Sequence, residues 1–182
     1  IAYRANMGVQ TSAPFANTYS LDFDAVDGYI DCGNSTVFNL TNTMTLSAWI
    51  RPSIATADDF IIAKRWTSNA YQMATNAANR PSCSIWIGGV RYNALGTTTL
   101  TPGTWYNIIV TFDGLELKIY TNGVLEGTTS ASGTIDINTD SLTIGKGLNS
   151  TIYNFNGLID EVAIFDTDQS ANVSTIYNSG IP

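Results

Sequence analysis

The sequence contains no histidine and few basic residues. Its 182 residues include 8 Lys and Arg against 15 Asp and Glu, which gives a formal net charge of −7. The lack of His excludes a histidine-based catalytic triad and removes the commonest transition-metal ligand. The basic residues are scattered and form no run, so the chain offers no basic face to nucleic acid. An acidic chain of this kind suits solubility and cation binding.

Cysteines and long apolar runs are also scarce. Cys32 and Cys83 are the only cysteines, too few for a zinc site or a disulfide framework. They form one disulfide if their strands are neighbours and otherwise remain two buried thiols; both alternatives stay open. No run of 18 apolar residues occurs, so we expect no membrane insertion. The first residue is Ile1 rather than Met, which indicates that a leader was removed or that this is part of a longer chain.

The composition is that of a globular chain, with 44% hydrophobic and 13% charged residues. The clearest pattern lies in the segment 105–129, where alternating apolar residues are interrupted by Asp113-Gly114 and Asn122-Gly123. These dipeptides are typical of two-residue hairpin turns, whose central residues need positive φ. The segment therefore predicts a three-stranded antiparallel meander.

Other short runs have the same alternating character. We expect strands within the ranges 19–23, 28–32, 44–52, 60–66, 70–75, 83–95, 141–145 and 157–166. Only the segment 168–180 has a helical pattern, with Asp168 or Ser170 as its cap. So many short strands in one chain predict an all-β sandwich or jelly roll with one short C-terminal helix. We expect a single domain over 1–182, in which 1–19 is an N-terminal extension or the first strand.

Several phrases stand in a familiar order: "LDFDAVDGYIDCG", "TMTLSAWIRP", "GTWYNIIVTFDGLELKIYTNGVLEG" and "FNGLIDEVAIFD". Over residues 20–180 the chain resembles the laminin-G-like, concanavalin A-like jelly-roll family, in its broad bacterial and viral branch. The resemblance implies a two-sheet antiparallel sandwich. It also implies a binding module for glycans or proteins, often part of a larger extracellular or virion protein and often carrying a structural calcium ion.

The first of these phrases departs from the family pattern. The family reads Phe-Asp-Gly-x-Asp-Asp-Tyr, whereas this chain has Ala25 at the third position and Gly28 at the sixth. If the family turn needs positive φ at position 25, Ala there costs steric energy. The geometry of this loop is the part of the resemblance that this departure puts in question.

Asp160 and Glu161 are adjacent acids within an otherwise apolar strand. Neighbouring strand residues point to opposite faces, so the two cannot form the carboxyl pair, about 5 to 10 Å apart, that a glycosidase needs. By the resemblance, Asp160 meets the loop of Asp24 and Asp27, and the three would hold a structural Ca²⁺. The alternative is that Asp160 accepts hydrogen bonds from backbone amides of that loop without a metal. Glu161 is expected to be solvated.

The middle of the chain carries a set of aromatic and basic residues suited to a sugar. Glycan sites stack sugar rings on aromatic rings and fix hydroxyl groups with polar side chains. The candidates for such a ligand-binding patch are Trp66, Tyr71, Trp86, Arg91 and Tyr92. The alternative is that alternate members of this set are core residues.

Together these observations favour a non-catalytic recognition or adhesion module, not an enzyme. We expect its partner to be a glycan or a cell-surface or virion protein and its location to be extracellular or on a virion surface. The alternative function is that of a structural assembly or decoration subunit of a virion or fibre, without a small ligand.

Overall fold

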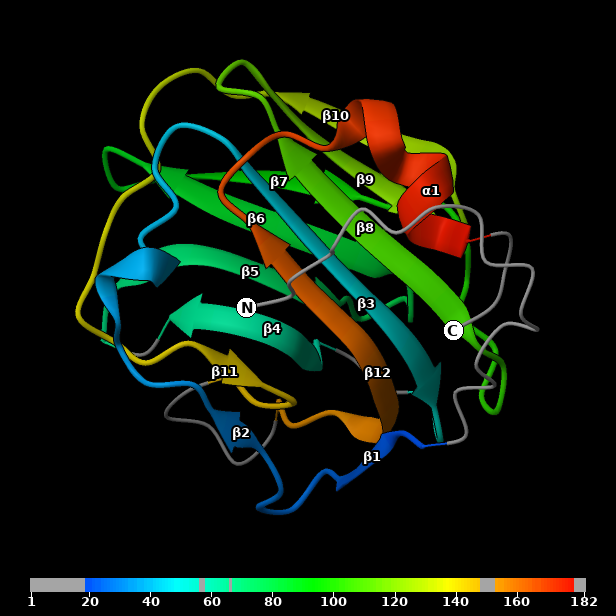
Figure 1. The fold of residues 1–182 in the computed structure, drawn as a ribbon. Coiled ribbons are helices and arrows are strands. Elements are labelled where there is room, and N and C mark those ends of the chain that lie inside the picture. Colours follow the sequence, from blue (N-terminus) through cyan, green and yellow to red (C-terminus); the bar gives the residue numbers. More distant parts are fainter. Residues whose placement is uncertain (1–18, 56–57, 66, 148–152, 179–182) are drawn as a thin grey trace, which may run out of the picture.

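The computed structural model describes residues 19–55, 58–65, 67–147 and 153–178. Its strands form two six-stranded sheets, and all named strand pairs are antiparallel. Sheet A has the order β1-β12-β3-β8-β9-β10, and sheet B, behind it in Figure 1, has the order β2-β11-β4-β5-β6-β7. This confirms the prediction of an all-β, two-sheet jelly-roll sandwich with one short C-terminal helix.

The strand bounds follow the predicted ranges closely. Sheet A consists of β1 (Leu21–Asp24), β12 (Asn156–Phe165), β3 (Met44–Pro52), β8 (Tyr106–Phe112), β9 (Glu116–Thr121) and β10 (Val124–Ser130). Sheet B consists of β2 (Ile30–Asp31), β11 (Thr143–Ile144), β4 (Phe60–Arg65), β5 (Asn69–Thr75), β6 (Pro81–Ile87) and β7 (Val90–Leu95). The helical segments are η1 (Thr36–Phe38), η2 (Ser170–Asn172) and α1 (Val173–Tyr177).

The predicted meander is β8-β9-β10, and its two turns differ. Asn122 and Gly123 have φ of 51° and 78° and join β9 to β10 as the sequence predicts. In the turn before β9, Gly114 has φ of 93° but Asp113 is not in the positive region. Asp113 instead precedes the turn, where its Oδ1 accepts a hydrogen bond from Glu116 N at 2.8 Å. The dipeptide therefore marks the turn correctly, but the turn lies one residue later than predicted.

One apolar core fills the space between the sheets. In β3, Leu46, Ala48 and Ile50 are fully buried in it, and they meet Ile108 and Val110 of β8. Burying each large apolar side chain contributes about 1.5–3 kcal/mol, so this alternation is what holds the two sheets together.

Helix α1 packs on the outer face of sheet A (Figure 1). Val173 and Ile176 contact Ile109 of β8 in a small cluster separate from the main core. Tyr177 stacks on Trp49 of β3, with ring centroids 5.7 Å apart. The described residues form no second α-helix over the outer face of sheet B.

Two expectations concern single features of the chain. Cys32 is half-buried and Cys83 is fully buried, and both are free thiols. Burial raises the pKa of Cys83 to about 12, so this thiol is un-ionised and unreactive at neutral pH. None of the helices in the described ranges has the length and apolar character needed to cross a bilayer.

Candidate functional site

The outer face of sheet B is built by the residues that alternate with the core. In β6, Cys83 and Ile85 point into the core, so Ser84 and Trp86 point outward. The register continues the row across the sheet, with Ser84 opposite Gln72 of β5 on one side and Asn93 of β7 on the other. Strand pairing therefore assembles a line of hydrogen-bonding side chains on the outside of the sandwich.

Two arginines meet at Trp86 on this face. The guanidinium carbon of Arg65 lies 5.2 Å from the centre of the Trp86 ring, and that of Arg91 lies 5.6 Å from it. Arg65 comes from β4 and Arg91 from β7, strands that lie on opposite sides of β6. We call Arg65, Trp86 and Arg91 the arginine–tryptophan cluster. Its contacts lie within the 6 Å range of cation–π attraction.

Hydrogen bonds to neutral side chains fix both guanidinium groups. Arg65 Nη1 donates to Gln72 Oε1 at 2.8 Å. Arg91 Nε donates to Ser84 Oγ at 2.9 Å, and Ser84 in turn donates to Asn93 Oδ1 at 2.9 Å. The polar row thus holds the arginines in one geometry while leaving part of each fork open to a ligand.

Aromatic rings extend the same face towards the start of β4. Phe60 and Tyr153 meet edge to face, with centroids 5.9 Å apart, and Arg65 lies 5.8 Å from the Phe60 ring centre. Phe60 is buried, whereas Tyr153 is half-buried. The ring of Tyr153 is therefore an available stacking surface at this end of the face, although the sequence analysis did not single it out.

Trp86 has a different role from the predicted one. Its side chain is only 6% exposed, because the two guanidinium groups cover it. It therefore offers little ring surface for stacking and instead supports Arg65 and Arg91. A hollow of about 560 Å³ adjoins it, lined by Ser68, Asn69, Trp86, Gly89, Asp136 and Ile137.

The other predicted ligand-binding residues fall on different sides of the sheet. Arg91 lies on the outer face as required, but Tyr71 and Tyr92 lie opposite Ile85 in the register and point inward. Tyr71 is fully buried, its hydroxyl donates to Phe38 O at 2.8 Å, and burial raises its pKa. The predicted patch thus divides between the core and the surface, because the strand period of two separates its members. Trp66 lies outside the described residues.

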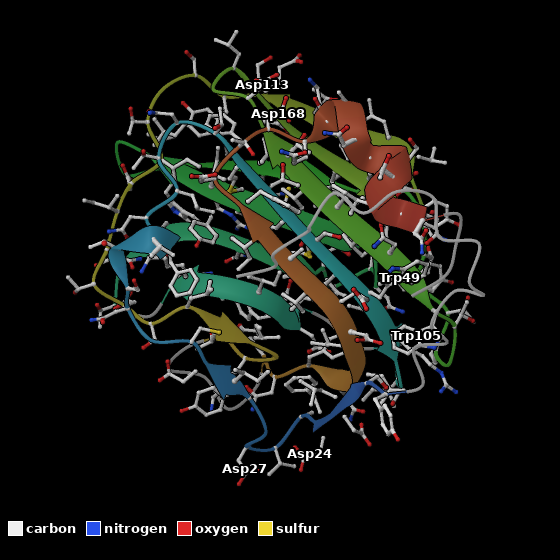
Figure 2. All side chains as sticks on the ribbon, in the orientation of Figure 1. Asp24, Asp27, Trp49, Trp105, Asp113 and Asp168 are labelled. Carbon is white, nitrogen blue, oxygen red and sulfur yellow. The ribbon has the colours of Figure 1, made fainter. Side chains whose placement is uncertain are left out.

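The three predicted calcium ligands do not converge. Asp24 pairs with Asn156 of β12, four residues before Asp160, and a strand rises about 3.4 Å per residue, so the two positions are roughly 14 Å apart. Asp160 pairs instead with Trp49, which Figure 2 shows far from Asp24 and Asp27. The described residues contain no group of three or more His, Cys, Asp or Glu placed to hold a metal ion.

Other residues hold the β1–β2 loop to the last strand. Asn154 Nδ2 donates to Val26 O at 2.9 Å, and Ala25 N donates to Phe155 O at 3.1 Å. Asp24 Oδ1 accepts from Val26 N at 2.9 Å, and this bond is the main cause of the lowered pKa of Asp24. The fastening role expected of Asp160 therefore belongs to Asn154 and the backbone. Ala25 has φ of 63°, so the residue that replaces the family's Gly does occupy the positive-φ region.

Asp160 and Glu161 lie at a β-bulge in β12. The register shifts between Asp160 and Ala163, and Glu161 has φ of 46°. Asp160 Oδ1 accepts a hydrogen bond from Glu161 N at 2.8 Å. The prediction of strict alternation is wrong here, because the bulge redirects the strand. As a result, both acids border one mainly apolar hollow of about 250 Å³, together with Leu21 and Ile159.

Two fully or partly buried charges were missed by the sequence analysis. Lys64 is fully buried and donates from Nζ to the carbonyl of Asp140 at 2.7 Å. Glu126 accepts hydrogen bonds from both Thr98 and Thr121. A strand pattern gives no sign of either, because each partner lies far away in the sequence or across a turn.

The chain matches known proteins at the level of family and fold. A family model described as the concanavalin A-like lectin/glucanases superfamily matches residues 24–172. No curated protein sequence matches the chain.

Solved structures with the same fold include the following three domains. One is the carbohydrate-binding module CBM40 of the Ruminococcus gnavus IT-sialidase bound to α2,3-sialyllactose, with 13% identity, TM-score 0.70, and coverage of 86% of this chain and 95% of that one. Another is domain 4 of the extracellular arabinanase AbnA from Geobacillus stearothermophilus with arabinotriose, with 18% identity, TM-score 0.60, and coverage of 75% and 67%. The third is the binding domain of Paraclostridial Mosquitocidal Protein 1, with 13% identity and TM-score 0.73; the match covers 91% of this chain but 44% of that one. These likenesses show a shared fold.

Proposed function

We propose that this chain, which belongs to the concanavalin A-like lectin/glucanases superfamily, is a non-catalytic glycan-binding module that acts outside the cell. The observation that carries the proposal is the outer face of sheet B. There, the Tyr153 ring and the guanidinium groups of Arg65 and Arg91 lie on one face, and the neutral polar side chains beneath them hold the two arginines.

This combination suits a sugar for a simple physical reason. A pyranose ring has an apolar face that stacks on an aromatic ring, and its edge carries hydroxyl groups that need donors and acceptors. Tyr153 supplies the ring, while Arg91 and Asn93 supply hydrogen-bonding groups whose positions the sheet fixes. A rigid, pre-organised surface keeps the entropic cost of binding low.

The structural neighbours support the same class of ligand. Two of them were solved with bound oligosaccharides, sialyllactose and arabinotriose, and the arabinanase is described as extracellular. Display outside the cell or on a virion, and attachment to a larger assembly, belong to this proposal. Asp160 accepts a hydrogen bond from the bulge amide of Glu161, and this structural role supports binding rather than hydrolysis.

A glycan array followed by calorimetry tests the proposal. We expect reproducible hits whose affinity falls at least tenfold, or about 1.4 kcal/mol, in Tyr153→Ala. Arg80→Ala is the matched control, since Arg80 is an exposed residue at the β5–β6 turn outside the proposed face. Absence of binding to any glycan on a broad array, with the protein folded, would refute the proposed function.

We also propose a structural calcium ion, bound without Asp160. Because Asp160 lies apart, the oxygens left for an ion at this end are the carboxylates of Asp24 and Asp27 and the carbonyls of the loop between β1 and β2. We expect EDTA to lower the melting temperature, and Asp24→Asn to abolish that response. A ligand present at 100 times its Kd stabilises the folded state by about 2.7 kcal/mol. A melting curve unchanged by EDTA would eliminate the ion.

Assembly is the second candidate function, and the edge of sheet A favours it. Val124 and Leu125 on the edge strand β10 are 64% and 49% exposed, and an open strand edge can pair with another chain. Light scattering separates the two functions. A defined oligomer that Leu125→Lys disrupts, combined with no glycan binding, would favour an assembly subunit.

A further inference from the structure

The arginine–tryptophan cluster lacks a counter-charge in a chain that is rich in acids. All 15 Asp and Glu residues lie within the described parts of the sequence. The ion pairs found there join Lys118 to Asp113 and Glu116, and none involves Arg65 or Arg91. Acidic residues outnumber basic ones in this chain, whose net charge is −7, yet neither arginine forms an ion pair with one of them. The cluster is therefore a local positive site on an acidic protein.

The cluster carries an electrostatic cost in the absence of a ligand. Two like charges contact the same indole ring, and their hydrogen-bond partners are the neutral residues Gln72 and Ser84. Burial first, and the charge of Arg91 second, lower the pKa of Arg65. An anion bound at the guanidinium groups would offset both costs, because it attracts the positive charges and reduces their mutual repulsion.

The donors of the cluster remain largely available. A guanidinium has five N–H donors in a planar fork. Arg65 uses one of them, towards Gln72, and Arg91 donates to Ser84 and, more weakly at 3.4 Å, to Asn93. Arg91 is exposed and Arg65 is half-buried, so a ligand can reach the remaining donors. Both forks are held by the Trp86 ring and by hydrogen bonds, so little side-chain entropy is lost on binding.

Asp136, the acid beside Trp86, forms no ion pair with either arginine. Asp136 borders the hollow beside Trp86, but its two carboxylate oxygens accept hydrogen bonds from Gly88 N at 2.8 Å and Gly89 N at 2.7 Å. These two hydrogen bonds orient the Asp136 carboxylate towards the backbone of the β6–β7 turn.

From these observations we propose that the glycan recognised by the outer face of sheet B carries a carboxylate, which the cluster of Arg65, Trp86 and Arg91 binds. This inference rests on the proposed glycan-binding function and specifies its ligand class as an acidic saccharide. Planar carboxylates match the guanidinium fork in a bidentate manner, and such charge-assisted pairs are stronger than neutral hydrogen bonds. The sugar ring that bears the carboxylate then lies towards Tyr153.

Matched ligands test the charge separately from the sugar. The probes are α2,3-sialyllactose and trigalacturonate, each compared with its carboxyl-reduced form, together with lactose 6′-sulfate, all by calorimetry on the intact protein. We expect at least tenfold tighter binding of a carboxylated probe than of its reduced form, and a loss of affinity as NaCl is raised. Arg91→Ala should lower affinity for the carboxylated probe at least tenfold and leave affinity for the reduced form unchanged, with Arg80→Ala as the control.

The possible failures are distinguishable. Equal binding of carboxylated and reduced probes would overturn the acidic-ligand inference and leave the glycan-binding function intact. Equal binding of the sulfate would overturn the choice of a carboxylate. No binding of any probe, neutral or acidic, here or on the broad array, would overturn both. Because the reduced ligands test the charge on the wild-type protein, the result does not depend on whether a variant folds.

Discussion

Glu126 connects the edge of sheet A to the loop that follows β7 in sheet B. It is the extra residue of a β-bulge in β10, which turns its side chain towards the neighbouring loop. Its Oε2 accepts hydrogen bonds from Thr97 N at 2.9 Å, Thr98 N at 3.2 Å and Thr121 Oγ1 at 2.8 Å, and its Oε1 accepts one from Thr98 Oγ1. Gly127 allows this approach, because a Cβ there would lie 2.2 Å from Leu95 O.

Replacing this carboxylate by an amide, in Glu126→Gln, removes the charge and keeps the shape. Hydrogen bonds to charged groups contribute about 1.5–3 kcal/mol and neutral ones about 0.5–1.5 kcal/mol. The amide oxygen can take the position of Oε2, and the Thr98 hydroxyl can turn to accept from the amide nitrogen. We therefore expect a loss of about 1–2 kcal/mol at pH 7, which lowers the melting temperature by about 3–6 °C in a protein of this size.

The pH dependence gives this prediction its sharper test. Burial alone would raise the pKa of Glu126, but hydrogen bonds from Thr98 and Thr121 outweigh it and lower the pKa below its usual value of 4.5. A carboxylate with a lowered pKa stabilises the folded state fully above pH 4.5, and this contribution is lost as the pH falls through the folded-state pKa. The stability difference between wild type and Glu126→Gln should therefore close on acidification.

Urea unfolding followed by Trp fluorescence at pH 7, 5, 4 and 3 measures this difference. Glu116→Gln is the matched control, since Glu116 forms a surface ion pair with Lys118 at 2.8 Å, and such pairs contribute about 0–1 kcal/mol. The reasoning fails if Glu126→Gln is no less stable than Glu116→Gln at pH 7. It also fails if the difference from wild type persists undiminished at pH 3.

Three further predictions concern single residues. Ala25→Gly should stabilise the protein by about 0.5–1 kcal/mol, because Ala at φ of 63° is strained, and a lower melting temperature would contradict this. Burial lowers the pKa of Lys64 from 10.5 while Asp140 opposes the shift, so the unfolded state binds more protons and stability should rise with pH up to about 10.5. Lys64→Met should lack that rise in melts between pH 8 and 10.5, and an equal slope in both proteins would count against it. Asp160→Ala should cost no more than about 1 kcal/mol, because water can replace the lost acceptor at the exposed bulge amide. Asp160→Asn should be less affected, and equal effects in urea unfolding would show that the acceptor is unimportant.

The candidate site was only partly predictable from the sequence. The sequence placed Trp86 and Arg91 in one binding region, and both lie on the outer face of sheet B. It also included Tyr71 and Tyr92, which the strand period assigns to the inner face once the register with Ile85 is known. The missing information was which face of each strand meets the core, and this depends on pairing with other strands rather than on local sequence.

The calcium prediction failed to bring its residues together for a related reason. The family phrase around Asp160 was aligned correctly with the last strand, yet β12 pairs with β1 so that Asn156, not Asp160, lies opposite Asp24. A shift of four residues along a strand separates two side chains by roughly 14 Å, more than any metal ion can bridge.

The sequence by itself determined the sandwich. Side chains in strands alternate with a period of two and hairpin turns need positive φ, so apolar alternation and Asn-Gly or Asp-Gly dipeptides are enough to specify strands, core faces and most turns. Only the tertiary structure decided the bulges at Glu126 and Glu161 and the meeting of Arg65 with Arg91 over Trp86. A bulge, and a contact among residues of β4, β6 and β7, both depend on how strands pair in register. That pairing is set by packing between residues far apart in the chain.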